Sequence, residues 1–320
     1  MSRKSNDQGR AYEYAWIETL YSVLREVRNT RIVDNSSLCA NQKAWESISE
    51  DTKRVFRISA ESAVKTILEL EPQMEENDED ELLLELKKDK AGVDGDVRDI
   101  VIKRDSLAWE VGLSIKHNHE AVKHSRLGRN LDFGNKWFGI PCSLEYWNDI
   151  KPVFDRLDQV ESETKWAEIA DKEDAIYVPL LNAFMKEIRR ACQENDTVPR
   201  RMIEYLIGTN DYYKVVSHDS QSLTVVSAFN VHGTLNKPSK VKVSAITIPL
   251  IELPTEIVAL RFKTGSKNTV EMYMNNGWQL SFRIHNASTK VENSLKFDTQ
   301  FIGMPPTVVH IECKWNSVSN

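Results

Sequence analysis

Two apolar runs, Val97–Ile102 and Leu107–Lys116, follow one another with only a short polar segment between them. Their β-branched and alternating residues predict a β-hairpin, which holds both strands side by side in one sheet. The first strand carries a carboxylate, Asp99, and the second ends on an ammonium, Lys116, so the hairpin brings the two charges toward one point. A carboxylate that binds a divalent cation beside a lysine is suited to phosphodiester hydrolysis, because the cation activates water and offsets developing charge.

Side chains alternate along a strand, so Lys116 shares its face of the second strand with Ser114 and Glu110. Asp96 and Asp99 are three positions apart and point to opposite faces of a regular strand, so only one of them faces Lys116. Asp99 leads directly into the apolar residues and is the preferred partner, with Asp96 as the alternative. A surface hairpin that carries unrelated charges is the simplest alternative to a catalytic one.

The composition suits a globular protein, because 320 residues that are 41% hydrophobic can form one large domain or two ordinary ones. No run approaches the roughly 18 apolar residues of a membrane-spanning helix. The polar N-terminus lacks the apolar core of a signal peptide. The cysteines show no C-x-x-C spacing, which predicts reduced thiols in a cytoplasmic protein rather than disulfides or a zinc site.

The charge is unevenly distributed along the chain. The formal net charge is −6, yet residues 199–320 contain 13 basic and 9 acidic residues. Part of the acidity comes from one run, Glu75–Glu81, which we interpret as a solvated linker. The acidic balance argues only weakly against a nucleic-acid partner, because contacts with phosphates are local.

The pattern of apolar residues changes near residue 198. Before this point, helical spacing predicts helices over Gly9–Arg28, Ser47–Met74, Ser143–Val160 and Thr164–Gln193, with helical character in Asn118–Arg126. After a short helix over Arg200–Ile207, β-branched runs predict strands over Tyr212–Val216, Leu223–Phe229, Val241–Ile248, Ile257–Phe262, Thr269–Met274, Gln279–Ile284 and Thr307–Ile311. We therefore expect an α/β part over residues 1–197 and a β-rich part over residues 198–320.

Beyond the hairpin pattern, the residues resemble a known family of nucleases. Asp99–Ile102 followed by Leu113–Lys116 resembles the PD-(D/E)xK core shared by many restriction endonucleases. More specifically, the segment Gly92–Leu127 (GVDGDVRDIVI…WEVGLSIKHNHEAVKHSRL) is similar to the HaeIII-type type II restriction endonucleases. The segments Leu131–Trp147 and Ser281–Pro306 also resemble that family, so the resemblance covers nearly the whole chain.

The resemblance implies an α/β fold with a PD-(D/E)xK-type nuclease core, a mixed sheet flanked by helices, and a β-rich C-terminal part that recognises DNA. It implies Mg²⁺-dependent hydrolysis of double-stranded DNA at a short palindrome, GGCC, by a homodimer that has no membrane partner. Two alternatives stay open. One is a non-catalytic DNA-binding module with a degenerate nuclease site, and the other is a helical interaction scaffold.

The chain departs from the general motif at its second acidic position, which is Ser114. A hydroxyl is a poorer ligand than a carboxylate for a hard cation, and Glu110 is roughly 13 Å further along the strand. The resemblance points to Glu13, on the first predicted helix, as the missing acid, with Glu61 and Glu69 as rivals. The expected catalytic set is Glu13, Asp99, Ser114 and Lys116, and the expected Mg²⁺ ligands are Asp99, Glu13 and Asp96.

Polar and basic residues outside the hairpin are candidates for contacts with DNA. Lys123 and Arg126 follow the second strand and suit phosphate contacts, and Asn118 is a polar candidate beside them. In the β-rich part, arginine can bind guanine through O6 and N7 in the major groove. This makes Arg261, Arg283 and Asn286 candidates for base recognition, although ordinary surface charge explains any one of them.

Overall fold

The computed structural model describes residues 3–87, 95–119, 122–160, 163–286 and 288–315, without the side chains of residues 3–6, 123 and 124. The chain forms two compact units that are not contiguous in sequence. One comprises Ser2–Glu120, Thr209–Ile251 and Pro306–Asn320, and the other Ala121–Gly208 and Glu252–Pro305. We call them the seven-stranded unit and the five-stranded unit after their sheets.

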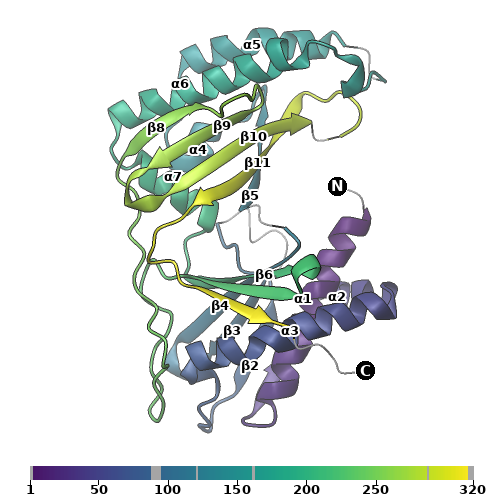
Figure 1. Ribbon diagram of the computed structural model, residues 1–320, viewed down its shortest axis with the longest axis vertical. Helices are drawn as coiled ribbons and strands as arrows, with labels where there is room; N and C mark the ends of the chain where they lie inside the picture. Colours follow the sequence, from purple (N-terminus) through teal and green to yellow (C-terminus); the bar gives the residue numbers. More distant parts are fainter. Residues whose placement is uncertain (1–2, 88–94, 120–121, 161–162, 287, 316–320) are drawn as a thin grey trace. The chain divides into compact units, whose positions relative to one another are not determined.

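The seven-stranded unit contains a mixed sheet with the strand order β1-β2-β3-β4-β6-β7-β12 (Figure 1). The β1–β2 and β4–β6 pairs are parallel, and the other neighbours are antiparallel. Helices α1 and α3 pack on the strands of this sheet and α2 packs on α1, which confirms the expected mixed sheet flanked by helices. The strands are β1 (Thr30–Ile32), β2 (Leu82–Leu86), β3 (Ile100–Arg104), β4 (Trp109–His117), β6 (Tyr212–His218), β7 (Leu223–Phe229) and β12 (His310–Lys314), and the helices are α1 (Arg3–Leu24), α2 (Ser36–Ser47) and α3 (Glu50–Leu70).

The predicted hairpin is present as β3 and β4. Ile100 is opposite Leu113 and Ile102 is opposite Val111, and all four side chains are buried in the core. The Asp99 N–H donates to the Leu113 carbonyl at 2.8 Å, so the pairing extends one residue beyond β3. Much of each strand is buried on both faces, and the pairs Ile100–Leu113 and Ile102–Val111 share the face that packs into the hydrophobic core. A slip by one residue would move these side chains off that face, so the core packing specifies the register.

The first helix packs its apolar stripe into the same core. Tyr12, Trp16, Leu20 and Leu24 recur at helical spacing on α1, and all four are fully buried. Residues of one helical face are brought together by this spacing, so the stripe binds α1 to the sheet. None of the helices in the described part of the chain is long and apolar enough to cross a membrane.

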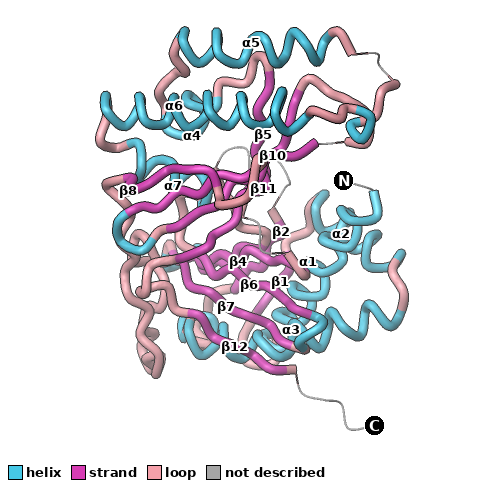
Figure 2. The backbone as a smooth tube through the Cα atoms, turned by 45° about the horizontal axis from the view of Figure 1, so that its top comes forward, coloured by secondary structure: helices cyan, strands magenta, loops and turns pink. Residues whose placement is uncertain are grey.

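The five-stranded unit contains an antiparallel sheet with the order β5-β11-β10-β9-β8, and Figure 2 shows helices beside its strands. Aromatic rings form its core: Phe184 of α6 contacts Phe282 and Phe297 of the sheet at centroid distances of 5.5 and 4.9 Å. The strands are β5 (Lys123–Gly128), β8 (Ile257–Phe262), β9 (Thr269–Met274), β10 (Gln279–Asn286) and β11 (Ser294–Gly303), and the helices are α4 (Phe133–Phe138), α5 (Leu144–Asp158), α6 (Val178–Glu194) and α7 (Val198–Ile207).

The organisation differs from the sequence-based expectation in three respects. The chain does not divide at residue 198, because β6, β7 and β12 pair into the sheet that contains β3 and β4. Residues 123–128 form β5 rather than a helix, because β5 pairs with β11 far along the chain. Residues 241–248 form bends and loops instead of the expected strand.

The acidic run Glu75–Glu81 is not a solvated linker. The fully buried Arg104 guanidinium binds the carboxylates of Glu76, Asp78 and Asp80 at 3.0, 2.7 and 2.9 Å. Arg28, also buried, binds Asp80 at 2.7 Å. The run therefore neutralises two buried arginines, a role that its composition alone does not predict.

Candidate active site

Asp99 lies at the open end of the hairpin, where β3 begins and β4 ends. Its Oδ2 accepts hydrogen bonds from the Ile115 N–H at 2.6 Å, the Lys116 ammonium at 3.0 Å and the Ser114 hydroxyl at 3.3 Å. Among the described residues, every hydrogen bond to this carboxylate ends on Oδ2, which leaves Oδ1 available to a cation. Ser114 thus acts as a donor to Asp99 and does not replace the missing acid.

Two carboxylates act on Lys116. Burial alone lowers the pKa of the Lys116 ammonium, but the charges of Asp99 and Glu13 outweigh it and raise the pKa above its ordinary value. The side chain of Lys116 is 32% exposed and that of Asp99 is 21% exposed, so the pair is open on one side. The two carboxylates therefore favour the protonated form of Lys116.

Glu13 reaches the site from α1. Its Oε2 accepts a hydrogen bond at 2.8 Å from the amide of Asn41, a buried residue of α2. The preceding residue, Tyr12, is fully buried and packs against the His117 ring at a centroid distance of 5.5 Å. Tyr12 and His117 thus hold α1 beside the end of β4, where Lys116 lies.

Asp96 is directed to a different partner. Both of its oxygens bind the guanidinium of Arg98, at 2.8 and 2.9 Å, and Arg98 also binds Glu110 at 2.6 Å. The stem of Arg98 lies across Gly112, where an added Cβ would be only 2.0 Å from it. Asp99, and not Asp96, is therefore the carboxylate that the hairpin brings to Lys116.

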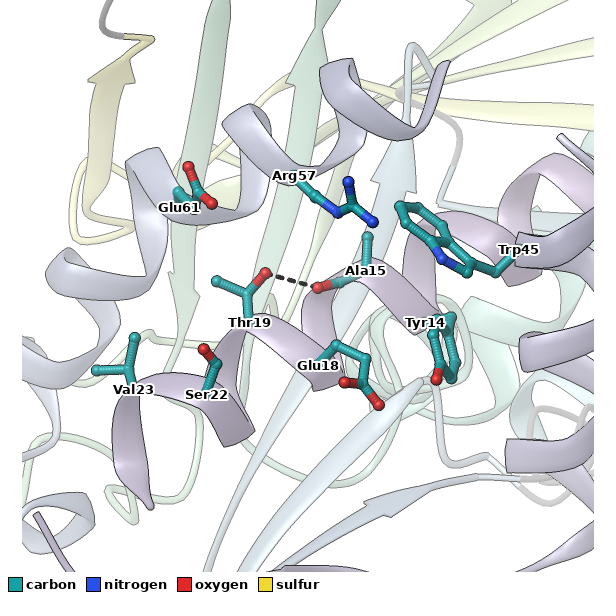
Figure 3. Close-up of a pocket in the computed structure, with 9 residues that line it drawn as sticks. All are labelled: Tyr14, Ala15, Glu18, Thr19, Ser22, Val23, Trp45, Arg57 and Glu61. Atoms are coloured by element: carbon teal, nitrogen blue, oxygen red, sulfur yellow. Dashed lines mark hydrogen bonds between the residues drawn. The ribbon is translucent and has the colours of Figure 1, made fainter. Parts of the chain in front are cut away.

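The rival acids Glu61 and Glu69 are on α3 and have other surroundings. Glu61 lines a hollow of about 400 Å³ together with Tyr14, Glu18, Trp45 and Arg57 (Figure 3). Neither Asp99 nor Lys116 is among the described residues that line this hollow. Glu69 is exposed and lies 3.9 Å from Lys65 of the same helix.

Three residues near the site were not predicted from the sequence. Asn41 holds Glu13, and Asp219 lies 2.8 Å from the His117 ring nitrogen through its Oδ2. Burial and the nearby Asp99 carboxylate raise the pKa of Tyr212, which places this tyrosine of β6 beside Asp99. Each of them comes from an element remote in sequence, so no local spacing could identify it.

The donor set suits a hard divalent cation. The described residues include no group of three or more His, Cys, Asp or Glu side chains arranged to hold a metal ion. Mg²⁺ commonly binds only one or two protein carboxylates, because it retains several waters and takes further oxygens from substrate phosphates. Asp99 and Glu13, the two carboxylates that act on Lys116, are of the type that such a cation prefers.

The predicted DNA contacts fall in both units. In the seven-stranded unit, Asn118 has a left-handed backbone with φ of 51°, and its Oδ1 accepts from the Asp219 N–H at 3.0 Å. In the five-stranded unit, the Asn286 amide donates to the Ser288 carbonyl at 2.6 Å. Lys123 is in β5, but its side chain lies outside the described part, as do residues 92–94 and 120–121 of the family-like segment.

The three predicted arginines lie on strands of the five-stranded sheet. The Arg126 guanidinium donates to the Ser294 hydroxyl at 2.9 Å, and Arg261 packs over the Tyr273 ring at 5.4 Å. Arg283 forms an ion pair with Asp298 at 3.0 Å. Each of these residues contacts a neighbouring strand, so each side chain is oriented by the sheet.

A mixed sheet flanked by helices, with two carboxylates and a lysine gathered at the open end of its hairpin, is the arrangement of restriction-type nucleases. The family model for the HaeIII restriction endonuclease matches residues 9–305. The chain is 47% identical over 317 residues to the type II restriction enzyme HaeIII of Haemophilus aegyptius, which covers 98% of this chain and 99% of that protein. The chain therefore belongs to the HaeIII restriction endonuclease family. No solved structure matches it.

Proposed function

We propose that the chain is a Mg²⁺-dependent type II restriction endonuclease that hydrolyses both strands of DNA at GGCC. Family membership supports site-specific DNA cleavage. The observation that carries the chemistry is the convergence of Asp99, Glu13 and Lys116, because the two carboxylates both act on the one ammonium. The base sequence and the metal come from the resemblance to the family.

We assign separate roles to the residues of the site. Asp99 and Glu13 would hold Mg²⁺, which when bound supplies an activated water and neutralises charge on the phosphate. Lys116, kept protonated by its two neighbours, places a positive charge beside the scissile phosphate. Ser114 and the Ile115 N–H orient the Asp99 carboxylate. Asp96 holds Arg98 instead of a metal ion.

We further propose that the enzyme acts as a homodimer in the cytoplasm. A palindromic target has a two-fold axis, and a two-fold protein dimer presents the same contacts to both half-sites. The five-stranded unit supplies the base recognition in this proposal, because three candidate arginines lie on its strands.

The test is digestion of a sequenced plasmid with purified protein and MgCl₂, followed by sequencing of the fragment ends. The proposal predicts ends at GGCC only, no cleavage with EDTA, and no cleavage by Lys116→Ala at equal protein concentration. Ends at random positions or at another sequence would contradict the proposed specificity. Salt-dependent binding of DNA without cleavage would instead support the degenerate binding module.

A further inference from the structure

One face of the five-stranded sheet is polar and basic. Strand residues alternate between the aromatic core and this face, so Phe282 and Ile284 are fully buried whereas Arg283 between them is exposed. We define the polar face by these residues. They are Arg126 of β5, Arg261 of β8, Glu271 and Tyr273 of β9, Ser281, Arg283 and His285 of β10, and Lys296, Asp298 and Gln300 of β11.

Three arginines form a diagonal line across this face. Arg261 is in register with Ser281, through Glu271, and Arg126 is in register with His285, through Lys296. Arg283 lies midway, two strands and two residues from each of them. Strand spacing and rise place each neighbour about 12 Å from Arg283, so the outer two are about 24 Å apart.

Arg283, the central arginine, has the shortest ion pair of the three. Arg283 and Asp298 are direct cross-strand partners, and the guanidinium donates to Asp298 Oδ2 at 3.0 Å. The Gln300 amide donates to the same oxygen at 3.3 Å, which fixes the carboxylate. The Asp298 side chain is 12% exposed, whereas that of Arg283 is 55% exposed. A buried acceptor thus orients a guanidinium that still faces outward.

Asp298 has a further property that a surface ion pair lacks. Its second oxygen, Oδ1, is buried and has no hydrogen-bond partner among the described residues. The other oxygen, Oδ2, holds the Arg283 guanidinium. A carboxylate that is largely removed from water forms a stronger charge-assisted hydrogen bond with a guanidinium than an exposed one does.

We propose that the polar face binds the major groove of the target DNA, that Arg283 reads a guanine there, and that Asp298 is the residue that positions Arg283. This inference rests on the proposed restriction activity and names the residues behind its specificity. Arginine binds guanine O6 and N7 with two parallel N–H groups, and this requires a fixed guanidinium plane. A site made only of G·C pairs demands such a donor.

The outer arginines suit a different role. The major groove is about 12 Å wide, so two cations about 24 Å apart fall on the phosphate backbones on either side of it. Arg126 and Arg261 therefore contribute affinity without base preference, because phosphates carry no sequence information. The charge on the face agrees with an anionic partner: four arginine or lysine residues are accompanied by one partly exposed acid, Glu271, and the buried Asp298.

The test uses three duplexes that differ only in the central palindrome: GGCC, AGCT, which replaces the outer G·C pair, and GATC, which replaces the inner one. Cleavage rates and equilibrium binding are measured for each. Arg283→Ala and Arg283→Lys should reduce the preference for GGCC over one of the two other duplexes by roughly ten- to hundredfold. Asp298→Asn should reduce the preference for GGCC over the same duplex that the Arg283 variants affect. Its preference for GGCC over the remaining duplex should not change.

Two sets of control variants separate base recognition by Arg283 from general attraction to phosphates and from effects on folding. Arg126→Ala and Arg261→Ala should each weaken binding to all three duplexes equally. Each should also lower the slope of log K against log[salt] by about the amount expected for the loss of one phosphate contact. Arg200→Ala, on α7, should change nothing, although Arg200 is 58% exposed and ion-paired with Glu204 at 2.8 Å, much like Arg283. Arg283→Lys keeps a positive charge opposite Asp298. It therefore tests the recognition of guanine by the guanidinium even if Arg283→Ala unfolds the protein.

The outcomes separate this inference from the proposed function. Unchanged ratios among the three duplexes in both Arg283 variants would overturn the role of Arg283, even if the wild-type enzyme cleaves GGCC. If the wild-type protein cleaves none of the duplexes, the proposed function fails, while the binding ratios still decide whether Arg283 distinguishes G·C from A·T. An effect of Asp298→Asn on a different base pair from that of Arg283 would overturn the positioning role.

Discussion

The Lys116 ammonium donates to Asp99 Oδ2 at 3.0 Å, although the two residues are 17 positions apart in the chain. The antiparallel register of β3 and β4 produces this contact, because it aligns the start of one strand with the end of the other. The same oxygen accepts the Ile115 N–H at 2.6 Å, so the orientation of the carboxylate is fixed from the backbone. A charge-assisted pair of this kind is set by the sheet and not by flexible loops.

Asp99→Asn and Lys116→Ala should each lower the cleavage rate by at least about a thousandfold, or roughly 4 kcal/mol in barrier height. Both changes alter charge at the phosphate and leave the hairpin core intact, so DNA binding should remain measurable. The matched control is Asp96→Asn, which should lose less than about tenfold because Asp96 binds Arg98. Cleavage assays with binding measured in parallel check this, and an inactive Asp96→Asn beside an active Asp99→Asn would reverse the assignment.

Arg104→Leu should destabilise the seven-stranded unit by about 3–5 kcal/mol, because it leaves the carboxylates around a fully buried guanidinium unpaired. Arg31→Leu is the control: its pair with Glu81 is exposed, so the loss of stability should be much smaller than that of Arg104→Leu. Urea unfolding at neutral pH measures both. Equal losses in the two variants would mean that the buried network adds no special stability.

Glu71 should make the protein less stable as the pH rises. Burial raises the pKa of its carboxyl to about 7, although the Asn236 N–H and the Tyr213 hydroxyl favour the charged form. A raised folded-state pKa means that the contribution to stability is fully present below the ordinary value of 4.5 and is lost as the pH approaches 7. Glu71→Gln should remove this decline and be more stable than the wild type at pH 8. Thermal unfolding at pH 5 and pH 8 tests the sign, and parallel curves for the two proteins would contradict it.

The parts of the fold that were predicted correctly are those encoded by local periodicity. The β3–β4 hairpin and the buried stripe of α1 follow from spacing within about ten residues of chain, and the adjacent strands β9 and β10 follow from short β-branched runs. The pairing of β5 with β11 joins residues such as Arg126 and Lys296, which no local pattern links. Propensity alone therefore made residues 118–126 resemble a helix.

The candidate site divides in the same way. Asp99 and Lys116 were brought together by the hairpin register, which the sequence pattern contains. The Asn41 amide that holds Glu13 comes from α2, and its position depends on how two helices pack. Likewise, β6, β7 and β12 join the sheet of β3 and β4, so a truncation after residue 198 would remove three of its strands and should not fold.

Methylation of cytosine in the target should block cleavage. A methyl group on cytosine projects into the major groove, where a close-fitting polar face would meet it. Fragments with methylated GGCC sites should stay intact under conditions that cut unmethylated fragments completely, while an unmethylated plasmid in the same tube serves as the internal control. Equal cleavage of the two substrates would contradict recognition through the major groove.

The role of Glu13 has the sharpest test, because Ser114 leaves the hairpin one carboxylate short and hard cations prefer charged oxygen ligands. Glu13→Gln keeps the size of the side chain and its hydrogen bond with Asn41, but it removes the charge that acts on Lys116. Activity should fall by at least about a hundredfold, or roughly 2.7 kcal/mol in barrier height. Raised Mg²⁺ or Mn²⁺ should restore part of it, because the lesion is in metal affinity.

Two further variants complete this test. Glu69→Gln changes an exposed acid of α3 and should cleave at the wild-type rate. Adding Ser114→Asp to Glu13→Gln returns an acid to the strand and should recover part of the activity, provided that the new carboxylate reaches the same cation as Asp99. Wild-type cleavage by Glu13→Gln at low Mg²⁺ would remove Glu13 from the site and direct attention to Glu61, which lines the hollow beside α1.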